Sequence, residues 1–89
     1  MKIKLTEFWN SKQALAIHCD TKEKAKTLLN AFNKLGKKRM GGNSYLSIDD
    51  YSIYMQYTCY TNNGLYCSYD WYKYNGYTIY EFEDVDLEN

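Results

Sequence analysis

The spacing of the tyrosines constrains the fold of this chain more than any other feature. All eleven lie between Tyr45 and Tyr80, and many recur at every third position, which matches neither the two-residue period of a strand nor the 3.6-residue period of a helix. In a strand, a spacing of three sends successive rings to opposite faces of the sheet. Because a single helix covers only one face, we expect some tyrosines to form an exposed aromatic surface.

The tyrosines must also supply part of the core. Leu, Ile, Val and Phe account for only 17 of the 89 residues, but the net charge is zero, so the composition remains that of a globular chain. A chain of this length forms one small domain, residues 1–89. We expect residues 1–13 to be a loosely attached arm or a short helical turn, and residues 84–89 to be an acidic tail.

The clearest predicted element is an amphipathic helix over about residues 21–35. Asp20 suits its N-cap, Glu23 the third position of a capping box, and Gly36 the position after its last turn. Its apolar side chains follow the 3.6-residue period: Ala25, Leu28, Leu29, Phe32 and Leu35. Before this helix, the alternation in Ala14–Cys19 predicts a strand with Leu15, Ile17 and Cys19 on one face.

The second half of the chain predicts a hairpin. The segments Tyr54–Tyr60 and Leu65–Tyr69 flank the Asn-Asn-Gly turn at 62–64, and a left-handed Gly64 would place Cys59 opposite Cys67. A short strand at Ser44–Ser47 is expected before the hairpin.

A short helical turn, Trp71–Tyr74, and a last strand, Tyr77–Phe82, are expected after the hairpin. The predicted order is β-α-β-β-β-(short α)-β. The expected fold class is α+β, with a mostly antiparallel sheet and the main helix packed on one face.

The charges divide the chain into two halves. Residues 1–39 hold ten of the eleven Lys and Arg and carry a net charge of +7, whereas residues 40–89 carry −7. One interpretation is that the halves attract each other across a single fold. The other is that one of them presents a charged surface to a partner.

The sequence offers little support for catalysis. His18 and Cys19 are adjacent in a predicted strand and point to opposite sides, so they do not form a nucleophile pair. Cys19, Cys59 and Cys67 are interpreted as buried hydrophobic residues, with a Cys59–Cys67 disulfide as the alternative; no C-x-x-C zinc motif is present. We therefore expect no enzyme activity, no catalytic residue, no metal and no cofactor.

Tyrosines among Ser, Asn and Asp are typical of protein-recognition surfaces, since rigid amphipathic rings give contact area at low entropy cost. Acidic residues beside them could compete for the nucleic-acid-binding groove of a basic partner. The predicted partner-binding residues are Tyr54, Tyr57, Tyr60, Tyr66, Tyr69, Trp71, Tyr74, Glu81, Glu83 and Asp84.

Two alternative functions use the basic residues instead. In the first, Lys37, Lys38 and Arg39 contact the phosphate of a nucleotide in a pocket between subunits, and an oligomeric protein sequesters this nucleotide. In the second, the basic helix binds nucleic acid. The second is disfavoured because the aromatic rings lie among acids, whereas single-strand binders interleave rings with cations.

Several segments resemble small uncharacterised proteins of phages and prophages of low-GC Gram-positive and related bacteria. They are Ala14–Asp20, the helix ending at Gly36, Thr58–Tyr60, Tyr66–Ser68 and Trp71–Asp84. The resemblance implies an accessory phage protein that inhibits bacterial defence, as anti-CRISPR proteins and sponges of immune-signalling nucleotides do, with no catalytic residue. It implies as partner a host protein, a defence nuclease or its complex, and action in the host cytoplasm.

Other expectations concern localisation and assembly. No stretch approaches the about 20 apolar residues of a membrane span, and no apolar run of signal-peptide length follows the first residues, so no membrane partner is expected. The odd number of cysteines fits a reducing compartment. Either a homodimer or a higher oligomer is compatible with the sequence.

Overall fold

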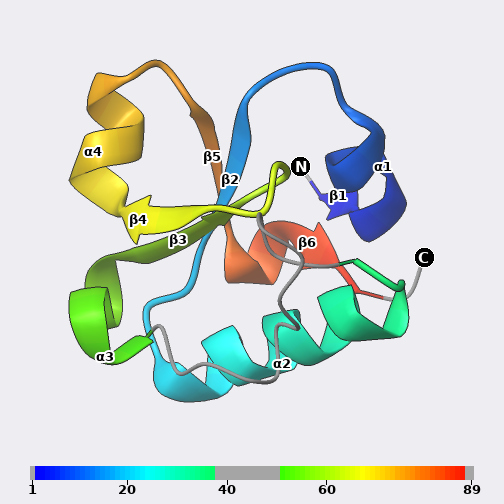
Figure 1. Cartoon of the computed structure of the whole chain (residues 1–89), viewed down its shortest axis with the longest axis horizontal. Helices are drawn as coiled ribbons and strands as arrows, with labels where there is room; N and C mark the ends of the chain where they lie inside the picture. Colours follow the sequence, from blue (N-terminus) through cyan, green and yellow to red (C-terminus); the bar gives the residue numbers. More distant parts are fainter. Residues whose placement is uncertain (1, 38–50, 88–89) are drawn as a thin grey trace.

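The computed structural model describes residues 2–37 and 51–87, and a four-stranded sheet in the order β4-β3-β2-β5 lies at its centre (Figure 1). The strands are β2 (Leu15–His18), β3 (Thr58–Thr61), β4 (Tyr66–Ser68) and β5 (Thr78–Glu81). β3 runs antiparallel to both β2 and β4, and β5 runs parallel to β2. The predicted α+β class is confirmed.

The helical elements surround this sheet. They are α1 (Leu5–Asn10), α2 (Lys22–Lys34), α3 (Tyr51–Tyr54), the 3₁₀ turn η1 (Met55–Tyr57), α4 (Tyr69–Tyr74) and the 3₁₀ turn η2 (Phe82–Asp84). A second, two-stranded parallel sheet pairs β1 (Ile3–Lys4) with β6 (Val85–Asp86). In Figure 1, α4 and α3 lie on the left of the sheet and α1 on the right, while α2 lies along the bottom.

The main helix, α2, forms as predicted. Its cap is Thr21 rather than Asp20: the Thr21 hydroxyl accepts a hydrogen bond from the Lys24 amide at 3.2 Å. Gly36 follows the helix with a φ of +76°, the left-handed conformation that ends many helices. The side chains of α2 that are buried are Ala25, Leu28, Leu29 and Phe32.

The expectation that only one face of the sheet is covered is wrong. Leu15, Ile17 and Cys19 face a core shared with α1 and α2, whereas Ala16 belongs to a second core with Cys59 and Tyr72. Tyr72 comes from α4 and is only 2% exposed. The short helix α4 therefore closes the second face.

The hairpin is confirmed at its turn and corrected at its start. Gly64 has a φ of +82°, and Cys59 pairs with Cys67 across β3 and β4. Tyr54 and Tyr57, however, lie in α3 and η1 and not in a strand. A spacing of three residues is the period of a 3₁₀ helix, so the tyrosine repeat fits this turn better than the predicted strand.

The two ends of the described chain are packed rather than loose. Leu5 and Phe8 of α1 are 1% and 0% exposed, so of the two alternatives for residues 1–13 the structure shows the short helical turn and not the loosely attached arm. Val85 is 7% exposed and lies in β6. The expected acidic tail is therefore partly replaced by a strand, because Val85 joins the main core. The predicted strand at 44–47 lies outside the described residues.

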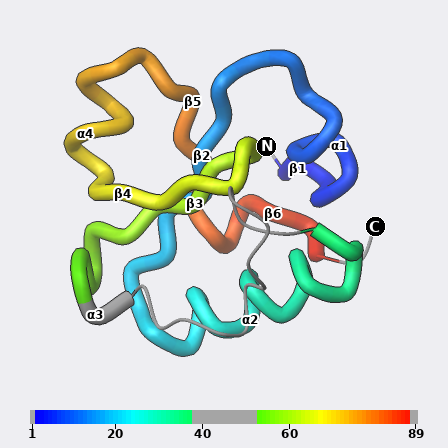
Figure 2. The backbone as a smooth tube through the Cα atoms, viewed as in Figure 1, coloured from blue at the N-terminus to red at the C-terminus, as the bar shows by residue number. Residues whose placement is uncertain are grey.

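Asn62, at the tip of the hairpin, ties α1 to the sheet. Its side-chain Nδ2 donates to the carbonyls of Phe8 (3.1 Å), Ser11 (3.4 Å) and Gln13 (3.0 Å). Its Oδ1 accepts from the Leu15 amide at 3.4 Å. Figure 2 shows the hairpin tip lying beside the N-terminal segment. One amide thus fixes the connection between α1 and β2.

Replacing Asn62 tests this connection. Asn62→Ala removes a donor and an acceptor from a partly buried site, and each net hydrogen bond is worth about 0.5–1.5 kcal/mol. We expect the free energy of unfolding to fall by about 2–3 kcal/mol in urea denaturation. Asn30→Ala, on the exposed face of α2, is the control and should change stability by less than about 0.5 kcal/mol. Equal effects of the two substitutions would contradict this role.

Candidate binding site

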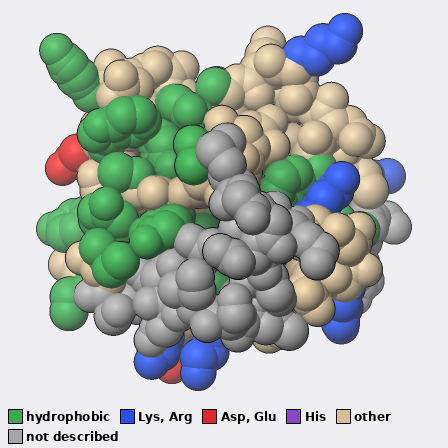
Figure 3. Space-filling model, in the orientation of Figure 1, with side chains coloured by type: hydrophobic (Ala, Val, Ile, Leu, Met, Phe, Trp, Pro, Cys, Tyr) green, Lys and Arg blue, Asp and Glu red, His purple; other side chains and the backbone are tan. Residues whose placement is uncertain are grey.

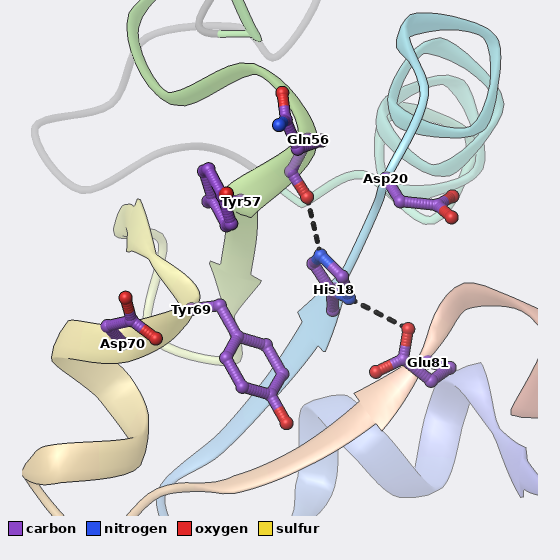
Figure 4. A pocket seen from close by; sticks show the side chains of 7 residues that line it. All are labelled: His18, Asp20, Gln56, Tyr57, Tyr69, Asp70 and Glu81. Atoms are coloured by element: carbon purple, nitrogen blue, oxygen red, sulfur yellow. Dashed lines mark hydrogen bonds and ion pairs between the residues drawn. The ribbon is translucent and has the colours of Figure 1, made fainter.

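A surface pocket lies where β2, β5, η1 and α4 meet (Figure 4). Its volume is about 630 Å³, within the range of ligand sites. The residues that line it are His18, Asp20, Gln56, Tyr57, Tyr69, Asp70 and Glu81. Three of these side chains are carboxylates and none is Lys or Arg. Asp20 is paired with Lys24 and Glu81 with His18, so the exposed Asp70 and the 47% exposed side chain of Glu81 are the carboxylates open to a donor group of a ligand.

His18 joins two walls of this pocket. Its Nδ1 lies 2.7 Å from Glu81 Oε1, and its Nε2 lies 2.6 Å from the backbone carbonyl of Gln56. A carbonyl oxygen only accepts, so Nε2 carries a proton in this arrangement. The bond to Glu81 then needs a second proton, either on Nδ1 or on the carboxyl group. His18 therefore clamps η1 and β5 onto the central strand.

Two tyrosines give the pocket aromatic walls. The Tyr69 ring lies 5.0 Å from the His18 ring, edge to face. Tyr57 is 53% exposed and comes from η1.

The turn η1 begins with a residue in the left-handed conformation. Met55 has a φ of +52°, a conformation that costs a non-glycine residue about 1–2 kcal/mol. The Thr58 hydroxyl, which donates to the Met55 carbonyl at 2.8 Å, helps to hold this turn.

Lys24 joins the basic and the acidic halves of the chain beside the pocket. Its Nζ donates to Asp20 Oδ1 at 2.7 Å and also pairs with Glu83 of η2. Hydrogen bonds from Lys24 lower the pKa of Asp20 and of Glu83 below the usual carboxyl range, and the same bonds, chiefly that to Asp20, raise the pKa of Lys24. The predicted attraction between the two halves is therefore present at this point.

The depressed carboxyl pKa values predict a pH-dependent contribution. Carboxyls with a lower pKa in the folded state stabilise the fold above their unfolded pKa of about 4, and this contribution disappears as the pH falls through the folded value. We expect Lys24→Met to lower the melting temperature at pH 7 and to change it less at pH 2–3, by differential scanning fluorimetry. A difference of the same size at both pH values would exclude this ion pair as the cause.

An aromatic surface extends beside the pocket. The name covers Tyr57, Trp71 and Tyr74 with Ile53 and Met55, which are between 50% and 82% exposed. In Figure 3, hydrophobic side chains gather on the left, over α4, β4 and α3, whereas Lys side chains appear at the bottom and right. Large exposed rings of this kind mark interaction sites more often than chance.

Some of the predicted binding residues lie together at the pocket, whereas others are buried in the core. Tyr57, Tyr69 and Glu81 line the pocket. Tyr60 is 1% exposed in the main core, so its assignment to a binding surface is wrong: β3 turns this side chain inward toward α2. Tyr66 is half-buried against the same core, and the Tyr54 ring packs on it at 5.9 Å.

The remaining predicted residues lie elsewhere. Glu83 pairs with Lys24, and Asp84 is half-buried in η2. Lys37 Nζ lies 5.5 Å from the centre of the Trp9 ring, a cation–π contact on the side of α1. Lys38 and Arg39 lie outside the described residues, so the predicted phosphate contact is represented by Lys37 alone.

Sequence reasoning missed His18, Asp20, Gln56 and Asp70 as pocket residues. The strand alternation predicts correctly that His18 and Cys19 point to opposite faces of the sheet. It does not identify the residues that surround His18. The missing information was the parallel pairing of β2 with β5, which sets His18 opposite Glu81.

The three cysteines are separated by the sheet. Cys19 lies in the main core, while Cys59 and Cys67 belong to the second one, and all are free thiols. Burial raises the pKa of Cys59 to about 12 and raises that of Cys19 further. Cys67 is only half-buried, and its Sγ lies 3.7 Å from the Tyr54 hydroxyl. Among the described residues, no three His, Cys, Asp or Glu side chains are placed to hold a metal.

These environments predict a strict order of thiol reactivity. We expect iodoacetamide at pH 8 to modify Cys67 in the folded protein, while Cys19 and Cys59 react only after unfolding, because the thiolate is the reactive form and burial suppresses it. Peptide mapping by mass spectrometry gives the modified positions. Modification of Cys59 at the rate of Cys67 would contradict the buried second core, and a Cys59–Cys67 disulfide would protect both.

Comparison with known proteins adds no relative. Neither protein-family models, nor curated proteins, nor solved structures gave a significant match to this chain. Within residues 2–37 and 51–87, no helix has the length and apolar character needed to cross a membrane.

Proposed function

We propose that this chain is a non-enzymatic, phage-encoded interaction protein that blocks a host defence system by binding a protein partner through its aromatic surface and acidic pocket. The observation that carries the proposal is the exposure of Trp71 (50%) and Tyr74 (82%) on α4, beside the pocket. The defence nuclease as partner, and the setting in the cytoplasm of a bacterial host, come from the sequence resemblance.

The position of α4 supports a role in recognition. Tyr72, on the same helix, is buried against the sheet, and its ring packs at 5.3 Å from Trp71 and 4.6 Å from Tyr77. These contacts hold α4 against the sheet and orient the Trp71 ring. Rigidly held aromatic rings lose little conformational entropy on binding, and they are enriched among the residues that dominate interface energies.

The charges beside this surface indicate a basic partner. Asp70 belongs to α4 itself, and Glu81 lies across the pocket on β5. Lys73, also on α4, is the one cation beyond Arg39 in the sequence. Complementary charge increases the rate at which partners meet and sets specificity. A basic nucleic-acid-binding groove is a surface of this complementary type.

The alternative functions have less support. Nucleic-acid binding through α2 would use its lysines, but Lys24 is engaged by two carboxylates. The nucleotide-sequestering oligomer depends on Lys37, Lys38 and Arg39 acting with tyrosines, and Lys37 lies against Trp9. Within the part of the chain that the structure describes, no specific contact favours either alternative over protein binding.

The aromatic surface can be tested by phage plating. We expect the intact chain to raise the plating efficiency of a phage restricted by a low-GC Gram-positive host's nuclease defence. Tyr74→Ala combined with Trp71→Ala should reduce this gain at least tenfold, because buried interface aromatics contribute about 2 kcal/mol or more each. Asn33→Ala, on the exposed face of α2, is the control and should retain full activity.

A double variant that is folded, as judged by its melting temperature, and protects phage as well as the parent would refute the aromatic surface as the binding site. Failure of the parent chain itself in a panel of defended hosts would refute the inhibitory function.

A further inference from the structure

We infer that the pocket at His18 is a subsite for a guanidinium group, and that it receives an arginine side chain of the partner. The inference rests on the proposed function in so far as the partner is a basic protein. It adds the chemical class of the group bound and the residues that bind it.

The aromatic walls favour a planar cation. Tyr57 and Tyr69 come from two different elements, η1 and α4, and both line the pocket (Figure 4). A guanidinium is planar and weakly hydrated, so it stacks on aromatic rings, whereas the compact, strongly hydrated ammonium of lysine does so less well. A pocket with rings on separate walls can hold such a plane between or against them.

The carboxylates supply charge and hydrogen-bond acceptors. Glu81 shares a hydrogen bond with His18 through Oε1, but a carboxylate has about four lone-pair sites, and the side chain of Glu81 is 47% exposed. Glu81 can therefore bind His18 and a second donor together. Asp70 is exposed on the opposite wall, in the first turn of α4. The five N–H donors of a guanidinium suit acceptors on more than one side.

His18 lies at the centre of the pocket and can report binding by NMR. It is the only histidine in the chain, and its ring is held at both nitrogens and contacts Tyr69. A cation that reaches Glu81 or Tyr69 must change the surroundings of this ring. The two carbon-bound ring protons of His18 are therefore a resolved NMR reporter of occupancy.

The test is a titration with N-acetyl-arginine amide, followed by the His18 ring signals. N-acetyl-citrulline amide, which has the same shape without the charge, is the control ligand. We expect the arginine probe to cause saturable chemical-shift changes that fit a dissociation constant in the millimolar range. The citrulline control should bind at least fivefold more weakly. The lysine analogue should bind at least threefold more weakly than the arginine probe.

Matched variants locate the bound group. Tyr57→Ala and Glu81→Gln should each weaken binding of the arginine probe at least threefold. Asn33→Ala, on the exposed face of α2 and outside the pocket, should leave the affinity unchanged. Tyr57→Leu retains an apolar side chain without a ring and serves if Tyr57→Ala does not fold. The guanidinium site would be overturned if the arginine and citrulline probes bound with equal affinity. It would also be overturned if the Tyr57 and Glu81 variants bound the arginine probe as tightly as the parent protein does.

The outcome can be separated from that of the proposed function. If the probe fails while phage protection still depends on Trp71 and Tyr74, the guanidinium site is refuted and the aromatic surface stands. If the probe binds as expected but the double variant protects phage fully, the site stands as a guanidinium pocket and the proposed inhibitory surface is refuted.

Discussion

The burial of β2 on both faces is the constraint on which the rest of this structure depends. Leu15, Ile17 and Cys19 of this segment fill one core, and Ala16 faces the other, with none of them more than 3% exposed. The methyl side chain of Ala16 leaves room for the large Tyr72 ring that α4 brings to this face. With both faces closed, His18 is the residue at which the central strand reaches the surface, and the pocket forms around it.

The local features were predictable because they depend on neighbours in the sequence. The helix α2 follows from its apolar period and the hairpin turn from Asn62 and Gly64. The alternation of β2 also separated Cys19 from His18 correctly. Each of these elements is specified within about ten residues, where propensity and capping act directly.

The errors arose where distant segments decide the outcome. Tyr60 has the same spacing as Tyr57, yet one is 1% and the other 53% exposed, because the chain changes from the 3₁₀ turn η1 to the strand β3 between them. The second face of the sheet is covered because α4 packs its Tyr72 side chain against it. The pocket required the parallel pairing of His18 with Glu81, 63 residues apart, and no local pattern encodes that contact.

We propose that the partner is a protein that docks on α4 and not a nucleic acid that docks on α2. The most direct measurement is site-specific photo-crosslinking in defended host cells, with a photoreactive phenylalanine analogue at position 74 or at position 33. Our account predicts a covalent adduct with one basic host protein from position 74 and none from position 33. Adducts from position 33 alone, or adducts of nucleic acid, would contradict it.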